Sequence, residues 1–298
     1  GSYRHILQWR RKHRTVGGCV EQRPEDSFTR GSLTRLLDKV RADRGLDLSQ
    51  YRPRYVERRV ATRLHALGLQ TYRQYSARLD TDPAEYARLL DALTINVTQF
   101  FRDPSVFEFL RAEVLPALFA AKAARHQRIV RIWSAGCATG QEPYSLAMAV
   151  LDETRHARSR NILPTVIGTD IDHTALEVAR RAVYPVAQLA HIPESDRARF
   201  VEVTGDHFHI LPEVTRHVRL QYLNLFQDEP IHGVDVVFCR NVFIYFNREE
   251  QERMLQVFWS GLSRGGYLVL GRSERLAPSM AERFELVSSR ERVYRKLA

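Results

Sequence analysis

The stretch from Arg131 to Leu146 constrains the fold of this chain more than any other: Arg-Ile-Trp-Ser-Ala-Gly-Cys-Ala-Thr-Gly-Gln-Glu-Pro-Tyr-Ser-Leu. It continues an apolar strand expected over 129–133, passes through a turn of small residues with Gly136 and Gly140, and opens into an amphipathic helix over 142–153. This order is typical of nucleotide-binding α/β folds, where a ligand lies against free backbone N–H groups at the carboxyl end of the strand. The stretch therefore predicts a Rossmann-like α/β domain.

Glu142 indicates which ligand such a turn would bind. It stands at the expected helix N-terminus, where a fixed negative charge repels the pyrophosphate that a dinucleotide would place there. No Gly-Lys-Ser/Thr follows, so a phosphate loop is excluded. The position suits a ligand with an adenosine and positive charge, and S-adenosylmethionine carries an ammonium and a sulfonium. The alternative is a tight turn in which Glu142 only caps the helix.

A second buried strand over 165–170 ends in Asp170. An acidic residue at the tip of the second strand of such a fold can accept hydrogen bonds from both ribose hydroxyls. The interval from Gly136 is longer than in a minimal unit, and a loop over 156–164 is expected to account for the excess. Asp170 has an alternative role as the N-cap of the next helix, ahead of Ala175, for which Asp172 competes.

The remainder of the α/β domain, 129–298, shows one interruption over 184–222. A short helix over 193–199 and three β-like pieces over 200–203, 207–211 and 217–222 predict a small antiparallel insertion there. A strand and its exit loop over 234–246, a helix over 248–262 and a strand over 266–270 resume the alternation. Two final runs near 284–287 and 292–296 predict a terminal antiparallel hairpin. The Asp206-His207-Phe208-His209 cluster is expected to be a solvated hairpin face, and no metal site is predicted.

Three segments precede that domain. Residues 1–26 are polar and basic and are interpreted as an extension or tag without an assigned function. Apolar residues at three- and four-residue spacing predict four helices and a small all-helical domain over 27–95. Residues 96–128 are interpreted as a linker and a covering helix, which Pro104 begins and which is expected to end at Val114.

Basic charge is concentrated in the helical domain. The formal net charge is +10, and the segment 39–79 holds ten basic and three acidic residues. Its second helix carries Arg54, Arg58, Arg59 and Arg63, and the last two lie one turn apart. Nucleic acid, an anionic membrane, an acidic protein partner or plain solvent all fit such a face. The absence of long apolar runs, of a signal peptide and of paired cysteines predicts a protein of the reducing cytoplasm that inserts into no membrane.

Four motifs in register carry a resemblance to one family. They are Asn-Val-Thr-Gln-Phe-Phe-Arg-Asp (96–103), Gly-Cys-Ala-Thr-Gly-Gln-Glu-Pro-Tyr-Ser (136–145), Thr-Asp-Ile-Asp (169–172) and Phe-Cys-Arg-Asn-Val-Phe-Ile-Tyr-Phe (238–246). In this order and spacing the chain resembles the bacterial chemotaxis receptor methyltransferases, the CheR family, over 28–297. The resemblance implies that S-adenosylmethionine is the cofactor, that S-adenosylhomocysteine is the product, and that glutamate side chains of chemoreceptors are methylated.

By this resemblance Arg102 and Tyr245 lie nearest the transferred methyl and are the expected catalytic residues. The basic second helix is the expected surface for the cytoplasmic helical domain of a methyl-accepting chemoreceptor, and the chain is expected to act as a monomer that binds no nucleic acid. The run 203–211 is shorter than in members whose β insertion grips a receptor tail, so the resemblance leaves tail binding open. The residues implied in cofactor binding are Asn96, Thr98, Arg102, Gly136, Glu142, Asp170, Asn224, Leu225, Arg240 and Asn241.

Methyl transfer to a glutamate carboxylate asks for few catalytic groups, and two alternative functions remain beside it. A glutamate carboxylate is ionised near neutral pH and attacks a sulfonium methyl directly, so no general base is needed. A nucleic-acid methyltransferase is the first alternative, and only the basic charge favours it. Amino-directed enzymes of that kind carry Asn/Asp-Pro-Pro-aromatic where this chain has 240–245, and Cys137 and Cys239 lack a neighbouring proline. The second alternative is a sensor that binds the cofactor without catalysis.

Overall fold

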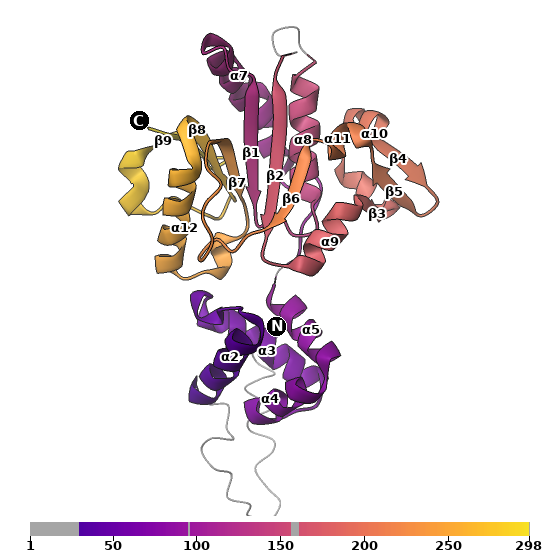
Figure 1. Ribbon diagram of the computed structural model, residues 1–298, viewed down its shortest axis with the longest axis vertical. Helices are drawn as coiled ribbons and strands as arrows, with labels where there is room; N and C mark the ends of the chain where they lie inside the picture. The colour runs from indigo at the N-terminus through magenta and orange to yellow at the C-terminus, as the bar shows by residue number, and fades with distance from the viewer. Residues whose placement is uncertain (1–29, 95, 156–160, 298) are drawn as a thin grey trace, which may run out of the picture. The chain divides into compact units, whose positions relative to one another are not determined.

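The structure is a computed structural model, and it describes residues 30–94, 96–155 and 161–297. The chain divides into a smaller unit, 30–48 with 57–88, and a larger unit, 49–56 with 89–297 (Figure 1). The expected extension over 1–26, the first residues of the expected helical domain and the 156–160 part of the expected loop lie outside the described residues. No helix of the described part is both long enough and apolar enough to cross a bilayer.

The all-helical part confirms the four helices that the apolar spacing predicts. Val40, Val60, Leu64 and Leu79 are almost completely buried between them. After the second helix the chain reverses at Gly68, whose φ of +66° is the left-handed conformation expected of a helix cap. The elements are α2 (Arg30–Arg44), η2 (Leu48–Gln50), α3 (Pro53–Ala66), α4 (Tyr72–Thr81) and α5 (Pro83–Leu93).

The larger unit is built on a seven-stranded sheet in the order β6-β2-β1-β7-β8-β10-β9 (Figure 1). The first five strands in this order run parallel, whereas β10 is antiparallel to both of its neighbours. This arrangement confirms the predicted α/β fold and the terminal hairpin. The strands are β1 (Ile129–Ala135), β2 (Leu163–Asp170), β6 (Val218–Tyr222), β7 (Val234–Cys239), β8 (Leu262–Leu270), β9 (Phe284–Ser288) and β10 (Val293–Lys296).

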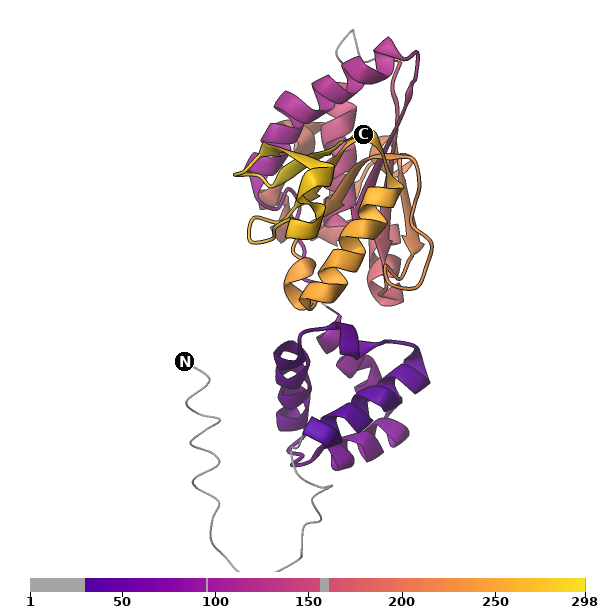
Figure 2. The ribbon, with the colours of Figure 1, turned by 90° about the vertical axis from the view of Figure 1, so that its left-hand side faces the viewer.

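Helices cover both faces of this sheet (Figure 2). Alternate residues of a strand point to opposite faces. Val130 and Ile132 of β1 join one apolar cluster with α7 (Leu115–Ala124) and α8, whereas Trp133 packs edge-on against Phe258 of α12, with ring centroids 5.4 Å apart. The strand is therefore buried on both sides. The helices and short turns are α8 (Gln141–Glu153), α9 (His173–Arg181), η5 (Phe243–Tyr245), α12 (Arg248–Gly261) and η6 (Pro278–Arg283).

The covering helix is longer than the sequence predicts. It begins at Pro104 as expected, but it continues past Val114 through α6 (Pro104–Phe109), the π-helical turn η3 (Leu110–Val114) and α7 (Leu115–Ala124). Pro116 has no N–H and ordinarily ends a helix. Here the turn widens, the N–H of Leu115 donates to the carbonyl of Leu110, and the helix accommodates the proline.

The antiparallel insertion has a different third strand from the expected one. Its sheet has the order β3-β5-β4, formed by β3 (Val183–Pro185), β5 (His207–Ile210) and β4 (Val201–Thr204). The run 217–222, predicted as part of it, instead forms β6, which pairs in parallel with β2 at the edge of the main sheet. An alternating pattern shows that a strand exists but not which strand it joins. The remaining elements are η4 (Val186–His191), α10 (Glu194–Phe200) and α11 (Pro212–Thr215).

Candidate functional site

The turn after β1 has a backbone that only small residues can form. Gly136 and Gly140 have φ angles of +76° and +95°. A Cβ added at Gly136 would lie 2.7 Å from a methyl of Val242, and one at Gly140 would lie 2.7 Å from the Cβ of Ala179. The N–H groups of residues 136 and 137 donate to the carbonyl of Thr169, at 2.8 and 2.9 Å, which ties the turn to the tip of β2. The predicted glycine turn is confirmed, and its glycines are required.

Asp170 lies at the tip of β2, as predicted, but it does not cap α9. One of its carboxylate oxygens accepts the N–H of Ala138 at 2.7 Å and the other accepts the N–H of Asp172 at 2.9 Å. The cap is Asp172, which accepts the N–H of Ala175 at 3.0 Å. Burial raises the pKa of Asp170, although its backbone hydrogen bonds oppose the shift. Asp170 thus joins the tips of two strands and brings a desolvated carboxylate to the carboxyl edge of the sheet.

Asp172 also holds the segment that contains Asn96. Its second oxygen accepts hydrogen bonds from the Thr94 hydroxyl and the Asn96 amide, both at 2.8 Å. Burial alone would raise the pKa of Asp172, but the hydrogen bonds from Asn96 and from the Ala175 N–H outweigh it and lower that pKa. One ionised carboxylate therefore begins α9 and anchors the start of the 96–103 motif.

Glu142 lies in the first turn of α8, with its side chain directed into the site. One of its oxygens accepts the Ser134 hydroxyl at 2.7 Å, and the other lies 4.0 Å from Nη1 of Arg240. Burial raises the pKa of Glu142, and the charge of Arg240 opposes that shift. A carboxylate that is partly desolvated and has a cation only at the limit of ion-pair distance favours a positively charged ligand.

Arg240 is buried and contacts main chain as well as carboxylates. Its side chain is 1% exposed, and Nη1 donates to the carbonyl of Arg102 at 2.8 Å while Nη2 donates to the Asp103 carboxylate. Asp103 adopts a left-handed φ of +56°. The guanidinium of Arg102 donates to the carbonyl of Val97 at 3.0 Å. The sequence places Arg240 with the cofactor residues, and the structure shows that it fixes the backbone carrying Arg102.

Glu274 belongs to this region, although the sequence analysis missed it. Its carboxylate accepts the N–H of Gly271 at 2.6 Å and that of Asn241 at 3.0 Å, and the residue is 3% exposed. It supports Asn241, which has a left-handed φ of +61°. Burial raises the pKa of Glu274 despite these backbone donors. An acidic residue shortly after a strand end, here four positions past Leu270, is the signal that points to it.

The other predicted residues occupy the same edge of the sheet. Tyr245 lies in η5 with its ring centroid 5.2 Å from that of Tyr55. Asn224 shapes the turn after β6, since its N–H donates to Asp228 at 2.7 Å and its amide oxygen accepts the N–H of Phe226 at 3.0 Å. Thr98 and Leu225 are partly buried.

The residues present fit a cationic adenosine cofactor. Two buried oxygens have no hydrogen-bond partner among the described residues, Oδ1 of Asn241 and Oε1 of Glu274. Such acceptors are costly unless a donor occupies the site. Oδ1 of Asn241 and the carboxylates of Glu142 and Asp170 offer acceptors to an ammonium and to ribose hydroxyls. Glu274 instead faces backbone N–H groups, including those of Phe243 and Ile244. This set of acceptors matches S-adenosylmethionine and does not match a phosphate.

The histidine cluster of the insertion begins at Asp206 in the turn between β4 and β5 and continues along the first three residues of β5. His207 contacts the carboxylate of Asp206 at 2.6 Å, and both side chains are exposed. Among the described residues there is no group of three or more His, Cys, Asp or Glu side chains with the arrangement of a metal site.

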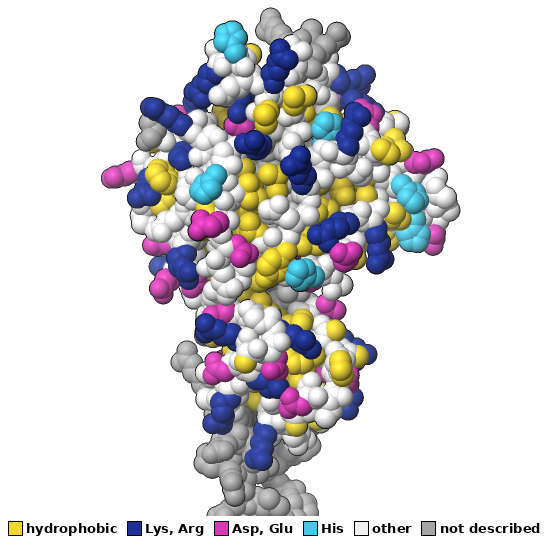
Figure 3. All heavy atoms as spheres, viewed as in Figure 1, with side chains coloured by type: hydrophobic (Ala, Val, Ile, Leu, Met, Phe, Trp, Pro, Cys, Tyr) yellow, Lys and Arg dark blue, Asp and Glu magenta, His cyan; other side chains and the backbone are white. Residues whose placement is uncertain are grey.

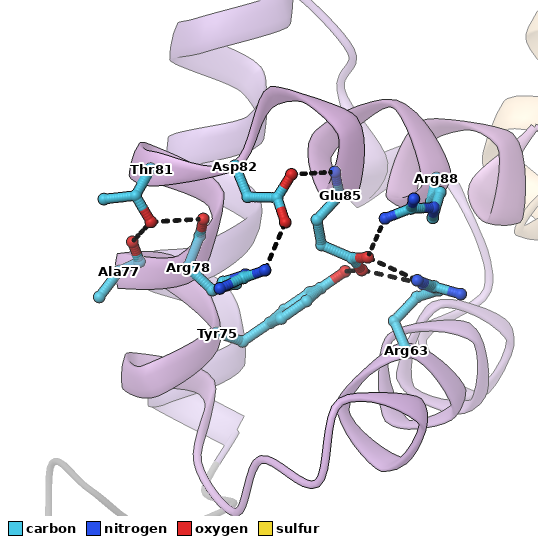
Figure 4. A network of polar contacts seen from close by, with 8 residues as sticks. All are labelled: Arg63, Tyr75, Ala77, Arg78, Thr81, Asp82, Glu85 and Arg88. Atoms are coloured by element: carbon cyan, nitrogen blue, oxygen red, sulfur yellow. Dashed lines mark hydrogen bonds and ion pairs between the residues drawn. The ribbon is translucent and has the colours of Figure 1, made fainter.

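The predicted receptor-facing arginines of α3 differ in their surroundings. Arg63 donates to the buried carboxylate of Glu85 through Nε at 2.9 Å and Nη2 at 2.5 Å, and the Tyr75 hydroxyl donates to the same carboxylate at 2.9 Å (Figure 4). Arg63 is therefore engaged within the smaller unit, and its expected role in receptor binding stays a prediction. Arg59 is partly buried, whereas Arg54 and Arg58 are exposed.

Replacement of Asp170 by alanine is expected to weaken S-adenosylhomocysteine binding by ~1–3 kcal/mol, the usual size of hydrogen bonds to a charged group. Titration calorimetry measures the effect, and circular dichroism checks that the variant is folded. Asp206→Ala, which removes an exposed carboxylate from the insertion turn, serves as the control. Unchanged affinity in folded Asp170→Ala would remove Asp170 from the ribose site.

As the pH is lowered, cofactor affinity is expected to begin to fall at a higher pH than the protonation of an exposed glutamate would cause. Burial raises the pKa of Glu142, so this carboxyl takes up a proton earlier than an exposed one and loses the charge that attracts the cofactor. Calorimetry over a pH series should show a flatter profile for Glu142→Gln, while the exposed Glu177→Gln control should follow the wild type. A Glu142→Gln profile identical to the wild-type profile would contradict the assignment.

Comparison with known proteins adds independent findings. The family model described as "CheR methyltransferase, SAM binding domain" matches residues 96–293, and "CheR methyltransferase, all-alpha domain" matches 32–94. The chain is 30% identical to the chemotaxis protein methyltransferase of Borreliella burgdorferi, with 84% of this chain and 90% of that protein covered. It is 36% identical to the probable chemotaxis protein methyltransferase of Rhizobium etli, with 80% and 90% covered.

A further relative is much longer than this chain. An uncharacterised 104.1-kDa protein of Rhodobacter capsulatus is 33% identical over 89% of the chain, and the chain spans 28% of its length. The same pair of domains therefore also occurs within a larger protein.

Proposed function

Because the chain belongs to the CheR methyltransferase family, we propose that it transfers the methyl group of S-adenosylmethionine to glutamate carboxylates of bacterial chemoreceptors. The observation that carries this proposal is the site at the carboxyl edge of the sheet. There Glu142 and Asp170 are desolvated carboxylates with raised pKa values, and Arg102 and Tyr245 lie on segments fixed to the same edge.

The reaction asks the chain mainly for positioning. The cofactor supplies an electrophilic methyl group on a sulfonium, and the acceptor carboxylate is already ionised near neutral pH. The carboxylate oxygen forms the new bond to carbon as the bond from carbon to sulfur breaks, which gives a methyl ester and S-adenosylhomocysteine. No proton is transferred, so no catalytic base is required.

Arg102 is the residue proposed to orient the acceptor. A guanidinium has five N–H donors, and the hydrogen bond to the Val97 carbonyl uses one of them. The structure shows no other hydrogen bond from this guanidinium to a described residue, so its remaining donors can bind a carboxylate through charge-assisted hydrogen bonds. The hydroxyl of Tyr245 supplies another donor. Attack neutralises the opposite charges of carboxylate and sulfonium, so a tight clamp on the carboxylate would slow the reaction. Arg102 therefore orients the carboxylate more than it stabilises it.

The partner in this proposal is the cytoplasmic helical domain of a methyl-accepting chemoreceptor, which docks on the exposed arginines of α3. The chain acts in the cytoplasm as a monomer and binds no nucleic acid. Arg58 of the smaller unit is exposed, and Arg63 is retained there by Glu85. Docking accordingly relies on the exposed arginines, while Arg63 keeps the helix in place.

Charge reversal at Arg58 is expected to raise the apparent KM for receptor on the order of tenfold, because steering by exposed charge acts on association. The affinity for S-adenosylhomocysteine should not change. Arg35→Glu on α2 makes the same charge change at an exposed residue of the same unit and serves as the control. An equal effect in both variants, or kinetics of the wild type that do not respond to salt, would contradict docking through α3.

The product identifies the function directly. Receptor-enriched membranes are incubated with the protein and methyl-labelled S-adenosylmethionine, and the label is then exposed to mild alkali. Release as methanol is expected, because a carboxyl ester hydrolyses under these conditions. Label that resists alkali and stays with nucleic acid would overturn the proposal and favour the nucleic-acid methyltransferase.

A further inference from the structure

A cavity of about 450 Å³ opens at the amino-terminal edge of the main sheet. Its walls come from the end of α7, the first residues of β1, the residue before β7 and the start of β8. The cofactor site lies where β1 and β2 end, so the two sites are at opposite ends of β1. The cavity is within the size range of small-molecule sites.

The charge around this cavity is unbalanced. Lys122 contacts the buried carboxylate of Asp235 at 2.7 Å, and Asp235 also accepts the N–H of residue 131 at 3.0 Å, so this lysine is neutralised. Five arginines that line the cavity have no side-chain hydrogen bond or ion pair within the part of the chain that the structure describes. They are Arg125, Arg128, Arg131, Arg264 and Arg295.

Three arginines elsewhere in the larger unit differ from these five. Arg111, Arg199 and Arg240 each pair with carboxylates. Figure 3 shows Lys and Arg side chains gathered at the upper end of the larger unit, where Figure 1 labels α7. Like charges around one concave surface repel each other and concentrate a positive potential there, and an anion with several charges would relieve that repulsion.

The walls also offer apolar surface. Leu118 and Ala121 of α7 line the cavity together with Ile129, a residue that is 48% exposed at the start of β1. Gly233 and Gly265, with φ angles of +70° and +75°, line the opposite part and carry no side chains that would fill the space. A ligand for this cavity therefore combines several negative charges with a flat or apolar group.

We propose that this cavity binds a nucleotide carrying two or more phosphate groups. Guanidinium groups bind phosphate through paired hydrogen bonds. Five of them offer more hydrogen-bond donors than a single phosphate group can accept. Ile129 and the α7 wall receive the base. A concave site of this volume admits a small molecule, whereas a duplex or a bilayer presents its phosphates on a broad surface. The site is independent of the proposed methyl transfer.

Calorimetry on the full chain saturated with S-adenosylhomocysteine tests the proposal, because the cofactor site is then filled. At physiological salt ATP is expected to bind once per chain, AMP at least tenfold more weakly, and inorganic triphosphate between the two. Arg128→Ser with Arg131→Ser should weaken ATP binding at least tenfold. Arg35→Ser with Arg219→Ser makes the same charge change at exposed residues that do not line the cavity and should leave ATP binding unchanged.

Several outcomes would overturn the proposal. The first is a dissociation constant for ATP weaker than about 1 mM. The second is an equal loss of ATP affinity in both double variants. The third is tighter binding of duplex DNA or of phosphatidylserine vesicles than of ATP. S-adenosylhomocysteine affinity and thermal melting of each variant show that it is folded. Because the readout is nucleotide binding, failure here leaves the proposed methyl transfer untouched, and the methanol-release assay tests that separately.

Discussion

Replacing Arg240 by methionine is expected to lower the rate of methyl transfer about a hundredfold, the usual cost of misplacing a reacting group by an ångström. Arg240 donates to the carbonyl of Arg102 and to the carboxylate of Asp103 from a side chain that is 1% exposed. Methionine fills much of the volume but donates no hydrogen bond. The segment that positions the acceptor would then lose its anchor, and Glu142 would lose the charge that opposes its raised pKa.

The rate is measured with labelled S-adenosylmethionine and receptor-enriched membranes, and calorimetry with S-adenosylhomocysteine reports the cofactor site separately. Arg180→Met is the control, since Arg180 forms an exposed ion pair with Glu177 and such pairs contribute little. A folded Arg240→Met variant with wild-type kcat would show that Arg102 keeps its position without Arg240.

The second large effect concerns the smaller unit. Glu85→Ala is expected to lower its free energy of unfolding by about 3 kcal/mol, the lower end of the cost of breaking a buried ion pair. The carboxylate is fully buried and accepts from Arg63 and Tyr75, with Arg88 at 3.6 Å (Figure 4). Its removal leaves Arg63 without its partner. The expected readout is a lower midpoint of chemical unfolding.

The pH dependence of the same network has a definite sign. Burial alone would raise the pKa of Glu85, but hydrogen bonds from Arg63 and Tyr75 outweigh it and lower that pKa. A carboxyl with a lowered pKa in the folded state stabilises the fold above its unfolded pKa, and this contribution is lost as the pH falls through the folded value. Lowering the pH should therefore reduce the difference in the free energy of unfolding between the wild type and Glu85→Ala.

Two further variants complete this test. Glu57→Ala removes an exposed carboxylate from α3 and should have little effect. Arg63→Met combined with Glu85→Leu removes both charges, and it should recover much of the stability lost in Glu85→Ala, since paired removal leaves no uncompensated buried charge. If Glu57→Ala and Glu85→Ala unfold alike, the network is not what holds this unit together.

The parts of the fold that follow from local pattern are those that the sequence predicts well. The apolar strand, the glycine turn and the helix over 129–153 depend on side-chain period and on backbone angles, and both are visible in one short stretch. The partner of the run 217–222 is not local. Val218 pairs with Val166 on β2, and nothing in an alternating segment states which strand it will meet.

The site residues also fall into two groups, those whose position follows from the local sequence and those whose position depends on distant residues. Asp170 and Glu142 stand at the ends of predicted elements, so their position follows from the pattern. Glu274 acts through the N–H of Asn241, 33 positions away, and the direction of Arg63 depends on Glu85 from another helix. Helical spacing shows which residues share a face, but not whether that face meets solvent or a neighbouring carboxylate.

The strand order has a consequence for how the chain folds. β1 is flanked by β2, which follows soon after it, and by β7, whose Val236 pairs with Ile132 from about a hundred residues farther along. Loop closure over such a distance is slow compared with the local contacts of helices. The residues of the smaller unit all precede β1 in the chain, so they leave the ribosome first and can fold first during synthesis. The apolar strand β1 must wait for β7, and that interval is when the chain is most exposed to aggregation.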